Sequence, residues 1–309
     1  MQKRNFKDYF IISLKGMAMG AADVVPGVSG GTIAFISGIY EELLASISSV
    51  NTSLIKKLKE EGFLSVWKAI NGNFMSALLA GIFISVLTLS KVIGNLIETH
   101  PILVWSFFFG LVLASILYVG KQIESWNFKI VLGLLLGALI AYYVTTLKPV
   151  DGDEISLGYV FMSGALAICA MILPGISGAF ILVILGAYKS ILGAIEDRDF
   201  KVIFTFIVGA LVGILSFSKV LKWLFSKYRN MTLAALTGFI IGSLNKIWPW
   251  KHAVTYRVNS HGEQVPFNEA SVLPWNYNGD PELLFAIVLA VAGFGLILLL
   301  ESLATNKTD

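Results

Sequence analysis

The stretch Pro-Gly-Val-Ser-Gly at residues 26–30 returns as Pro-Gly-Ile-Ser-Gly at residues 174–178. Both copies lie inside apolar segments that are about as long as a bilayer is thick, roughly 20 residues. The residues that follow each copy also match, since Gly38 in the first half is equivalent to Gly186 in the second. Broken helices at equivalent points of two halves line the binding sites of membrane transporters, so this repeat predicts both a fold and the place of a site.

The composition is that of an integral membrane protein. Hydrophobic residues make up 56% of the 309 residues and charged residues only 14%, so the chain cannot cover itself with a polar surface. The net charge of +3 gives no indication of nucleic acid as a partner, because most Lys and Arg are needed to set orientation in the membrane. Hydrophobic stretches lie at 9–25, 27–48, 73–97, 102–120, 128–147, 156–173, 175–195, 201–225, 231–248 and 283–302.

These stretches divide the chain into two membrane repeats, at 1–148 and 149–309, with five segments each. The match extends past the Pro-Gly phrase, since Lys91 aligns with Lys219 and the neighbouring Gly and Ser residues align as well. Because five is odd, the second repeat enters the membrane from the opposite side, which predicts an inverted repeat. We therefore expect an all-α polytopic membrane protein made of two inverted repeats of five hydrophobic segments.

No polar loop separates the first two segments of either repeat. This favours a re-entrant helical hairpin broken at Pro-Gly, although a full pair of spans would return the chain to the same side. The expected hairpins cover 9–48 and 156–195. The expected full spans are 73–97, 102–120 and 128–147 in the first repeat and 201–225, 231–248 and 283–302 in the second.

The Lys and Arg residues predict the orientation. With the N-terminus in the cytoplasm, the larger set of loop cations lies inside, and only Lys148, Arg198, Lys201, Lys251 and Arg257 lie in outside loops. Both termini are then cytoplasmic. The segment 249–282 becomes an outer loop, rimmed with tryptophan and tyrosine.

The repeated phrase has the chemistry of an anion site. Proline opens a half-helix without losing a hydrogen bond, glycine lets a ligand approach the backbone, and serine adds a hydroxyl beside unpaired N–H groups. Such a helix start favours phosphate or carboxylate. The alternative is that Pro and Gly serve only helix packing or a kink. The predicted cradles are Ser29, Gly30, Gly31 and Thr32 in the first copy and Ser177, Gly178 and Ala179 in the second.

Asp23 lies in an apolar stretch three residues before Pro26, and its counterpart in the second repeat is Met171. An ionisable group at membrane depth is a functional candidate by default, here for proton or sodium coupling. The alternatives are that Asp23 caps the half-helix after Pro26 or pairs with Lys15. No other cofactor is expected.

Two further sets of charged residues are candidates for the functional site. Lys91 and Lys219 each lie in a Ser-Lys-Val stretch and are predicted to neutralise an anionic headgroup, with snorkelling to the membrane surface as the alternative. Lys222 is expected to snorkel. Glu41 and Glu42 are weaker candidates at the end of the first half-helix.

Catalytic and metal chemistry is not indicated. The three histidines fall in predicted loops without ligand spacing, and no histidine lies in an apolar segment where it could activate a serine. No nucleotide-binding signature appears. The lone Cys169 has no second cysteine with which to form an intramolecular disulfide. Transport is therefore a better interpretation than catalysis.

The stretches Gly-Ala-Ala-Asp-Val-Val-Pro-Gly-Val-Ser-Gly-Gly-Thr at 20–32 and Leu-Pro-Gly-Ile-Ser-Gly at 173–178 resemble the bacterial and archaeal polyprenyl-phosphate transporter family. The resemblance implies a flippase in the cytoplasmic membrane that returns undecaprenyl phosphate from the outer to the inner leaflet, for reuse in cell-wall and surface-glycan synthesis. Its partners would be this lipid and the surrounding membrane lipids. On the family's pattern the site maps onto Asp23, Pro26, Gly27, Ser29, Gly30, Gly31, Pro174, Gly175, Ser177 and Gly178.

A rival from another class is an ion-coupled transporter or channel for a small anion, because inverted repeats with broken helices serve that function equally well. A lipid-phosphate enzyme is the weakest alternative, since a catalytic base is missing from the apolar segments. The oligomeric state is not determined by the sequence.

Overall fold

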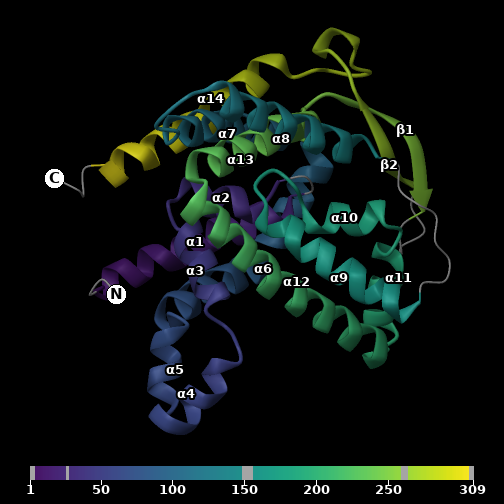
Figure 1. Ribbon diagram of the computed structural model, residues 1–309. Coiled ribbons are helices and arrows are strands. Elements are labelled where there is room, and N and C mark those ends of the chain that lie inside the picture. Colours follow the sequence, from purple (N-terminus) through teal and green to yellow (C-terminus); the bar gives the residue numbers. More distant parts are fainter. Residues whose placement is uncertain (1–3, 26–27, 148–155, 259–263, 306–309) are drawn as a thin grey trace.

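The computed structural model describes residues 4–25, 28–147, 156–258 and 264–305 (Figure 1). Pro26 and Gly27 of the first motif lie outside these residues, as does the predicted boundary between the repeats at 148/149.

Helices form in all ten predicted hydrophobic stretches, and 27–48 and 175–195 are each split into two. In the first half they are α1 (Phe6–Val24), α2 (Gly30–Ile36), α3 (Tyr40–Ser48), α6 (Gly72–Thr99), α7 (Pro101–Lys121) and α8 (Phe128–Thr146). In the second half they are α9 (Leu157–Ile172), α10 (Gly178–Ile184), α11 (Tyr188–Glu196), α12 (Phe200–Lys227), α13 (Arg229–Ser243) and α14 (Leu283–Thr305). Two more helices, α4 (Ser53–Glu61) and α5 (Phe63–Ala69), lie between the predicted hydrophobic stretches 27–48 and 73–97.

Within the described residues, four helices are long and apolar enough to cross a membrane, namely α6, α7, α8 and α12. The pair α10 and α11 passes the same test together but is bent by 106°, as a broken span or a re-entrant loop would be. The chain is thus a helical, multi-pass membrane protein.

The two halves correspond element by element. Helices α2 and α10 have 7 residues each, α3 and α11 have 9, and α6 and α12 have 28. The breaks also match, because Gly38 has a φ of 71° and Gly186 a φ of 67°. Helix α1 packs on α6 as α9 packs on α12, while α8 packs on α13 as α7 packs on α14. The last helices of each half therefore pack against the other half.

Glycines let the paired helices approach closely. A Cβ added at Gly81 of α6 would meet the backbone of Ser13 in α1, and one at Gly209 of α12 would meet the backbone of Phe161 in α9. These two glycines are equivalent in the repeat. Small residues at such crossings bring backbones into van der Waals contact, which is the main attraction between helices in lipid.

Gly81→Val is expected to lower the yield of folded protein and its melting temperature, because overpacking at a tight contact costs about 1–3 kcal/mol. Gly94→Val on the same helix is the matched control, since an added Cβ there has nothing within 4 Å. Thermal melting in detergent, followed by size-exclusion chromatography, measures the difference. Equal melting temperatures for the two variants would contradict this packing.

The two broken hairpins differ in burial. All seven residues of α2 are buried, whereas only Gly178, Leu182 and Ile184 of α10 are buried. Figure 1 shows α2 in the interior beneath α13, and α10 beside α9 and α11 nearer the edge. The first half-helix is part of the core, and the second is more accessible.

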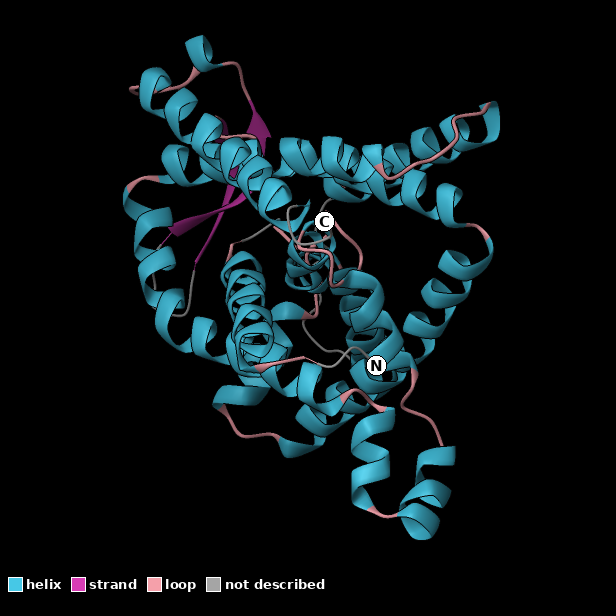
Figure 2. Cartoon of the chain, turned by 90° about the vertical axis from the view of Figure 1, so that its left-hand side faces the viewer, coloured by secondary structure: helices cyan, strands magenta, loops and turns pink. Residues whose placement is uncertain are grey.

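The chain between α13 and α14 contains regular structure that we did not predict. The expected outer loop at 249–282 contains an antiparallel hairpin of β1 (Lys251–Val258) and β2 (Gln264–Ser271), the magenta ribbon of Figure 2. The 3₁₀ turns η1 (Leu244–Ile247) and η2 (Pro274–Asn276) flank it. β-Branched and aromatic residues alternate with polar ones in β1, which is the pattern of a strand and was overlooked in a segment framed by long apolar stretches.

Candidate functional site

The two Pro-Gly motifs meet in the fold. The Ser29 hydroxyl lies 3.2 Å from the carbonyl oxygens of both Met171 and Leu173 at the end of α9. The amide of Gly175 donates a 3.0 Å hydrogen bond to the Thr32 hydroxyl. Segments that are more than 140 residues apart in sequence therefore form one polar contact within the buried part of the protein.

The glycines of the motifs permit this contact. A Cβ at Gly31 would lie 2.5 Å from the carbonyl oxygen of Ile172, and one at Gly178 would lie 2.7 Å from that of Ala167. Gly175 has a φ of +86°, in the left-handed region where an L side chain is strained. The predicted alternative, that these glycines serve helix packing, thus has direct geometric support at all three positions.

The start of α2 is closed by the chain itself. Asp23 Oδ1 accepts a 2.7 Å hydrogen bond from the amide of Gly30, and Ser29 Oγ accepts one of 3.1 Å from the amide of Gly31. The amide of Thr32 donates to the carbonyl of Ser29 at 2.9 Å. The first predicted cradle therefore offers a ligand none of these three amides in this conformation.

Asp23 and Lys15 lie at opposite ends of α2. Lys15 Nζ donates a 2.5 Å hydrogen bond to the carbonyl oxygen of Ser37, which follows the last residue of the helix. A carboxylate at the start and an ammonium at the end both match the helix dipole. The contacts of Asp23 are therefore those of a cap on α2, and Asp23 does not pair with Lys15.

The start of α10 is open. Ser177 is only 8% exposed, and its hydroxyl has no hydrogen bond in the described part of the chain. The amides of Gly178 and Ala179 have no partner among the described residues either, whereas Ala179 is exposed. The second cradle thus has three unused donors, two of them on the buried Ser177 and Gly178 and one on the exposed Ala179.

A cation that the sequence reasoning missed lies beside this cradle. Lys246, in the turn η1, places Nζ 4.5 Å from the centre of the Phe180 ring, and Phe180 is the third residue of α10. Lys246 is half-buried, and within the described chain it forms no ion pair. It lies near the end of the predicted span 231–248. The repeat comparison could not find it, because the aligned residue of the first half is Tyr118.

The neighbouring Lys251 has its charge matched. Its Nζ lies 3.5 Å from a carboxylate oxygen of Glu269, 2.7 Å from the carbonyl oxygen of Lys246 and 4.3 Å from the centre of the Trp105 ring. Burial lowers the pKa of the Lys251 ammonium to about 8, although Glu269 acts to raise it. Glu269 of β2 therefore pairs directly with Lys251 and acts on Lys246 only through its field, while the ammonium of Lys246 lies against the Phe180 ring of α10.

The predicted lysine pair lies elsewhere. Lys91 on α6 and Lys219 on α12 are both exposed, and within the described chain no hydrogen bond or ion pair links either to a motif. Glu41 forms a 2.6 Å ion pair with Arg229, which joins α3 to the start of α13. In the part of the chain that the structure describes, no group of His, Cys, Asp and Glu side chains is placed to hold a metal ion.

Comparisons with known proteins extend the resemblance. The family model VCA0040-like, described as undecaprenyl phosphate translocase-like, matches residues 19–265. A polyprenyl-phosphate transporter of Vibrio cholerae serotype O1 is 48% identical over 301 residues, which cover 96% of this chain and 97% of the relative. One of Staphylococcus aureus is 30% identical over 253 residues, covering 76% and 85% of the two chains. No solved structure matches. This chain belongs to the undecaprenyl phosphate translocase-like family.

Proposed function

We propose that this protein transports polyprenyl phosphate and binds the phosphate headgroup at the start of α10. The observation that carries the proposal is a set of donors there that have no hydrogen bond or ion pair among the described residues, namely the Ser177 hydroxyl, the amides of Gly178 and Ala179, and the ammonium of Lys246. A phosphate monoester supplies the acceptors and the negative charge that these groups lack. The lipid is the one that the V. cholerae and S. aureus relatives are named for.

The unassisted crossing of a phosphate through the hydrocarbon core is prohibitive, because a buried charge must be paired and hydrogen-bonded. In our proposal the protein supplies both at the start of α10, while the isoprenoid tail stays in lipid. The exposed Ala179 marks the side from which the headgroup reaches the cradle.

We further propose that the first motif is the same kind of cradle in its closed form. Asp23 Oδ1 accepts the hydrogen bond from the amide of Gly30. It thus occupies the place that a phosphate oxygen takes when this cradle is open. Ser29, Gly31 and Thr32 would then line the cradle when α2 opens and α10 closes. Protonation of Asp23, or sodium binding to it, weakens the charge-assisted hydrogen bond from the amide of Gly30 and couples the exchange to an ion gradient, because the two states differ in their affinity for that ion.

The remaining predicted residues take supporting roles. Pro174 and Gly175 break the helix before α10, and we assign the same role before α2 to Pro26 and Gly27. The exposed Lys91 and Lys219 attract the headgroup on the lipid-facing sides of α6 and α12, and their long stems also suit snorkelling. Glu41 holds α3 to α13 through Arg229.

The proposed architecture is two inverted repeats, 1–148 and 149–309, each with a re-entrant hairpin and three spans. The equal lengths of α2 and α10, of α3 and α11 and of α6 and α12 support it. Both termini lie in the cytoplasm on the positive-inside pattern, in the cytoplasmic membrane. The transport direction is from the outer to the inner leaflet, so that the lipid carrier is reused for the cell envelope.

Reconstitution into liposomes tests the function. Fluorescent polyprenyl phosphate in the outer leaflet is expected to become inaccessible to a membrane-impermeant quencher in protein-containing liposomes and to stay accessible in protein-free ones. Entrapped radioactive phosphate tests the rival small-anion transporter. Release of that phosphate without lipid exchange would contradict the proposal and support the rival.

A further inference from the structure

The short helices α4 and α5 form an arm that extends away from the body of the protein in both views (Figures 1 and 2). We use "arm" for residues 53–69. Neither helix contributes a buried residue, although the arm joins the core helix α3 to the span α6. Packing within the chain therefore leaves the apolar side chains of the arm without a partner surface.

The arm is amphipathic. Ile55, Leu58, Phe63 and Leu64 are 62%, 48%, 67% and 65% exposed. Ile55 and Leu58 lie three residues apart and so share one face of α4, whereas Lys56, Lys57 and Glu60 lie on the other. Lys59 lies four residues after Ile55, at the edge of the apolar face. A helix with one apolar face and a lysine-rich polar face is typical of segments that lie in the plane of the membrane surface.

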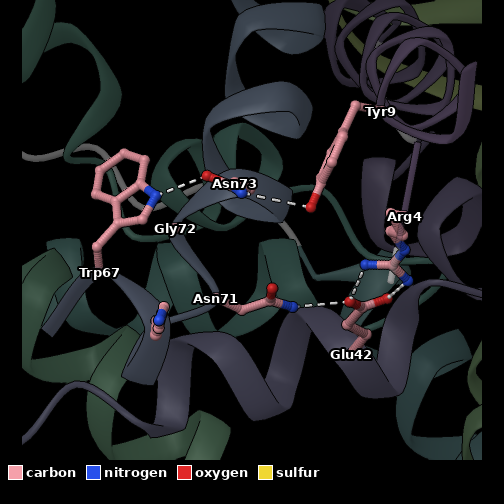
Figure 3. A pocket seen from close by; sticks show the side chains of 8 residues that line it. Arg4, Tyr9, Glu42, Trp67, Asn71, Gly72 and Asn73 are labelled. Atoms are coloured by element: carbon pink, nitrogen blue, oxygen red, sulfur yellow. Dashed lines mark hydrogen bonds and ion pairs between the residues drawn. The ribbon is translucent and has the colours of Figure 1, made fainter. Parts of the chain in front are cut away.

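The root of the arm, residues 67–73, is fixed to the span α6 and to α1. Trp67 Nε1 donates a 2.7 Å hydrogen bond to Asn73 Oδ1, and Asn73 Nδ2 donates one of 3.5 Å to the Tyr9 hydroxyl (Figure 3). These residues line a pocket of about 310 Å³. The arm is thus a positioned element and not a free loop.

A second set of bonds in the same pocket ties the root to α3. Asn71 Nδ2 donates a 2.7 Å hydrogen bond to Glu42 Oε1, and Arg4 holds both oxygens of Glu42 at 2.5 and 2.7 Å (Figure 3). Asn71 has a φ of 53°, so the chain turns sharply between α5 and α6. The ring of Trp67 lies where a side chain at Gly72 would be. The arm therefore does not continue the axis of α6.

This turn keeps the arm near the membrane surface. α6 begins at Gly72 and is a candidate span, so the membrane surface lies near its first residues. α5 is 7 residues long, which is about 10 Å in a helix, so Phe63 and Leu64 stay within reach of that surface.

The positive charge of the arm favours an anionic lipid surface as its partner. Residues 53–69 hold four lysines, at 56, 57, 59 and 68, against two glutamates, at 60 and 61, which gives a net charge of +2. Two lysines form i,i+4 pairs with the glutamates at 3.8 and 3.7 Å, while Lys59 and Lys68 form no ion pair within the described chain. An anionic lipid surface complements this charge, whereas the arm of a second copy would repel it.

We propose that the arm docks on the anionic membrane surface from which α6 enters the bilayer. Ile55, Leu58, Phe63 and Leu64 insert at the boundary between headgroups and acyl chains, and Lys59 and Lys68 contact lipid phosphates. The arm then fixes the depth and tilt of α1 and α6 through the contacts at its root. This inference is independent of the proposed substrate.

Spin labels on the full chain test the proposal in liposomes that contain phosphatidylglycerol. Single cysteines replace Ile55, Leu58, Phe63 or Leu64 on the apolar face, or Lys56 or Glu60 on the polar face, in a Cys169→Ser background. We expect the labels on the apolar face to be relaxed more by oxygen than by a water-soluble nickel chelate, and those on the polar face to show the reverse.

Lys59→Gln combined with Lys68→Gln is expected to shift the arm from the immersed toward the water-exposed form by about 30-fold, since each lysine at an anionic surface is worth about fivefold. Equal access of the nickel chelate to both faces would overturn the proposal. Spin–spin broadening that grows with the protein-to-lipid ratio would overturn it as well, because it would show that a second copy covers the arm.

Discussion

Lys246→Gln lowers the leaflet exchange of polyprenyl phosphate by about 10- to 100-fold. A hydrogen bond between a charged donor and an acceptor is worth about 1.5–3 kcal/mol, and each 1.4 kcal/mol is a factor of ten. The loss is large because Lys246 is the cation beside the open cradle, while the charge of the nearby Lys251 is already matched by Glu269. Glutamine keeps most of the length of the side chain and an N–H donor but carries no charge.

Quencher-accessibility kinetics in liposomes measure the effect, with protein content matched by gel and folding checked by thermal melting. Lys222→Gln on α12 is the control, because Lys222 is an exposed lysine that our account leaves in a snorkelling role. It should exchange lipid like the wild type, and Lys246→Arg should retain most of the activity. An unchanged rate for Lys246→Gln would show that the headgroup binds elsewhere.

Asp23→Asn abolishes the response of lipid exchange to an ion gradient and leaves the fold intact. Asparagine retains a side-chain oxygen that accepts the hydrogen bond from the amide of Gly30, which in the wild type is 2.7 Å long. It carries no charge, so neither a proton nor sodium can change its state. The variant therefore separates the role of Asp23 as a cap from its proposed role in coupling.

The comparison variant Asp23→Ala removes the acceptor as well. Loss of a helix cap costs about 0.5–2 kcal/mol, so its melting temperature should fall below that of Asp23→Asn. Exchange is measured with an imposed proton gradient, with an imposed sodium gradient and with none. If a gradient stimulates exchange equally in the wild type and in Asp23→Asn, Asp23 is a helix cap and has no role in coupling.

The helices were predictable where hydrophobicity is the dominant signal. In a bilayer, backbone groups must be paired within the segment, so a long apolar stretch becomes a helix almost regardless of its neighbours. The repeat predicted that Gly38 and Gly186 are equivalent, but not that a helix breaks at each of them. The arm and the β-hairpin were missed because their short amphipathic elements lie between such stretches, where polar residues were taken for loops.

The candidate site was predictable only in part. The repeat indicated that both motifs matter, but it could not show that one is closed by Asp23 while the other is open. Symmetry also favoured Lys91 and Lys219, which are exposed on the structure, over Lys246, which has no lysine counterpart in the first half. Tertiary contacts between the halves cause these differences, and such contacts cannot be predicted from the local sequence.

Protection of a cysteine at position 179 by substrate tests the central claim most directly, namely that the headgroup binds at the start of α10. In a Cys169→Ser background, Ala179→Cys is treated with a charged, water-soluble thiol reagent, with Val92→Cys and Val220→Cys beside the predicted lysine pair as controls. Our account predicts that polyprenyl phosphate, but not the uncharged polyprenol, slows modification at position 179 in a saturable manner and leaves the two controls unchanged. Protection at position 92 or 220 without protection at position 179, or equal protection by polyprenol, would contradict it.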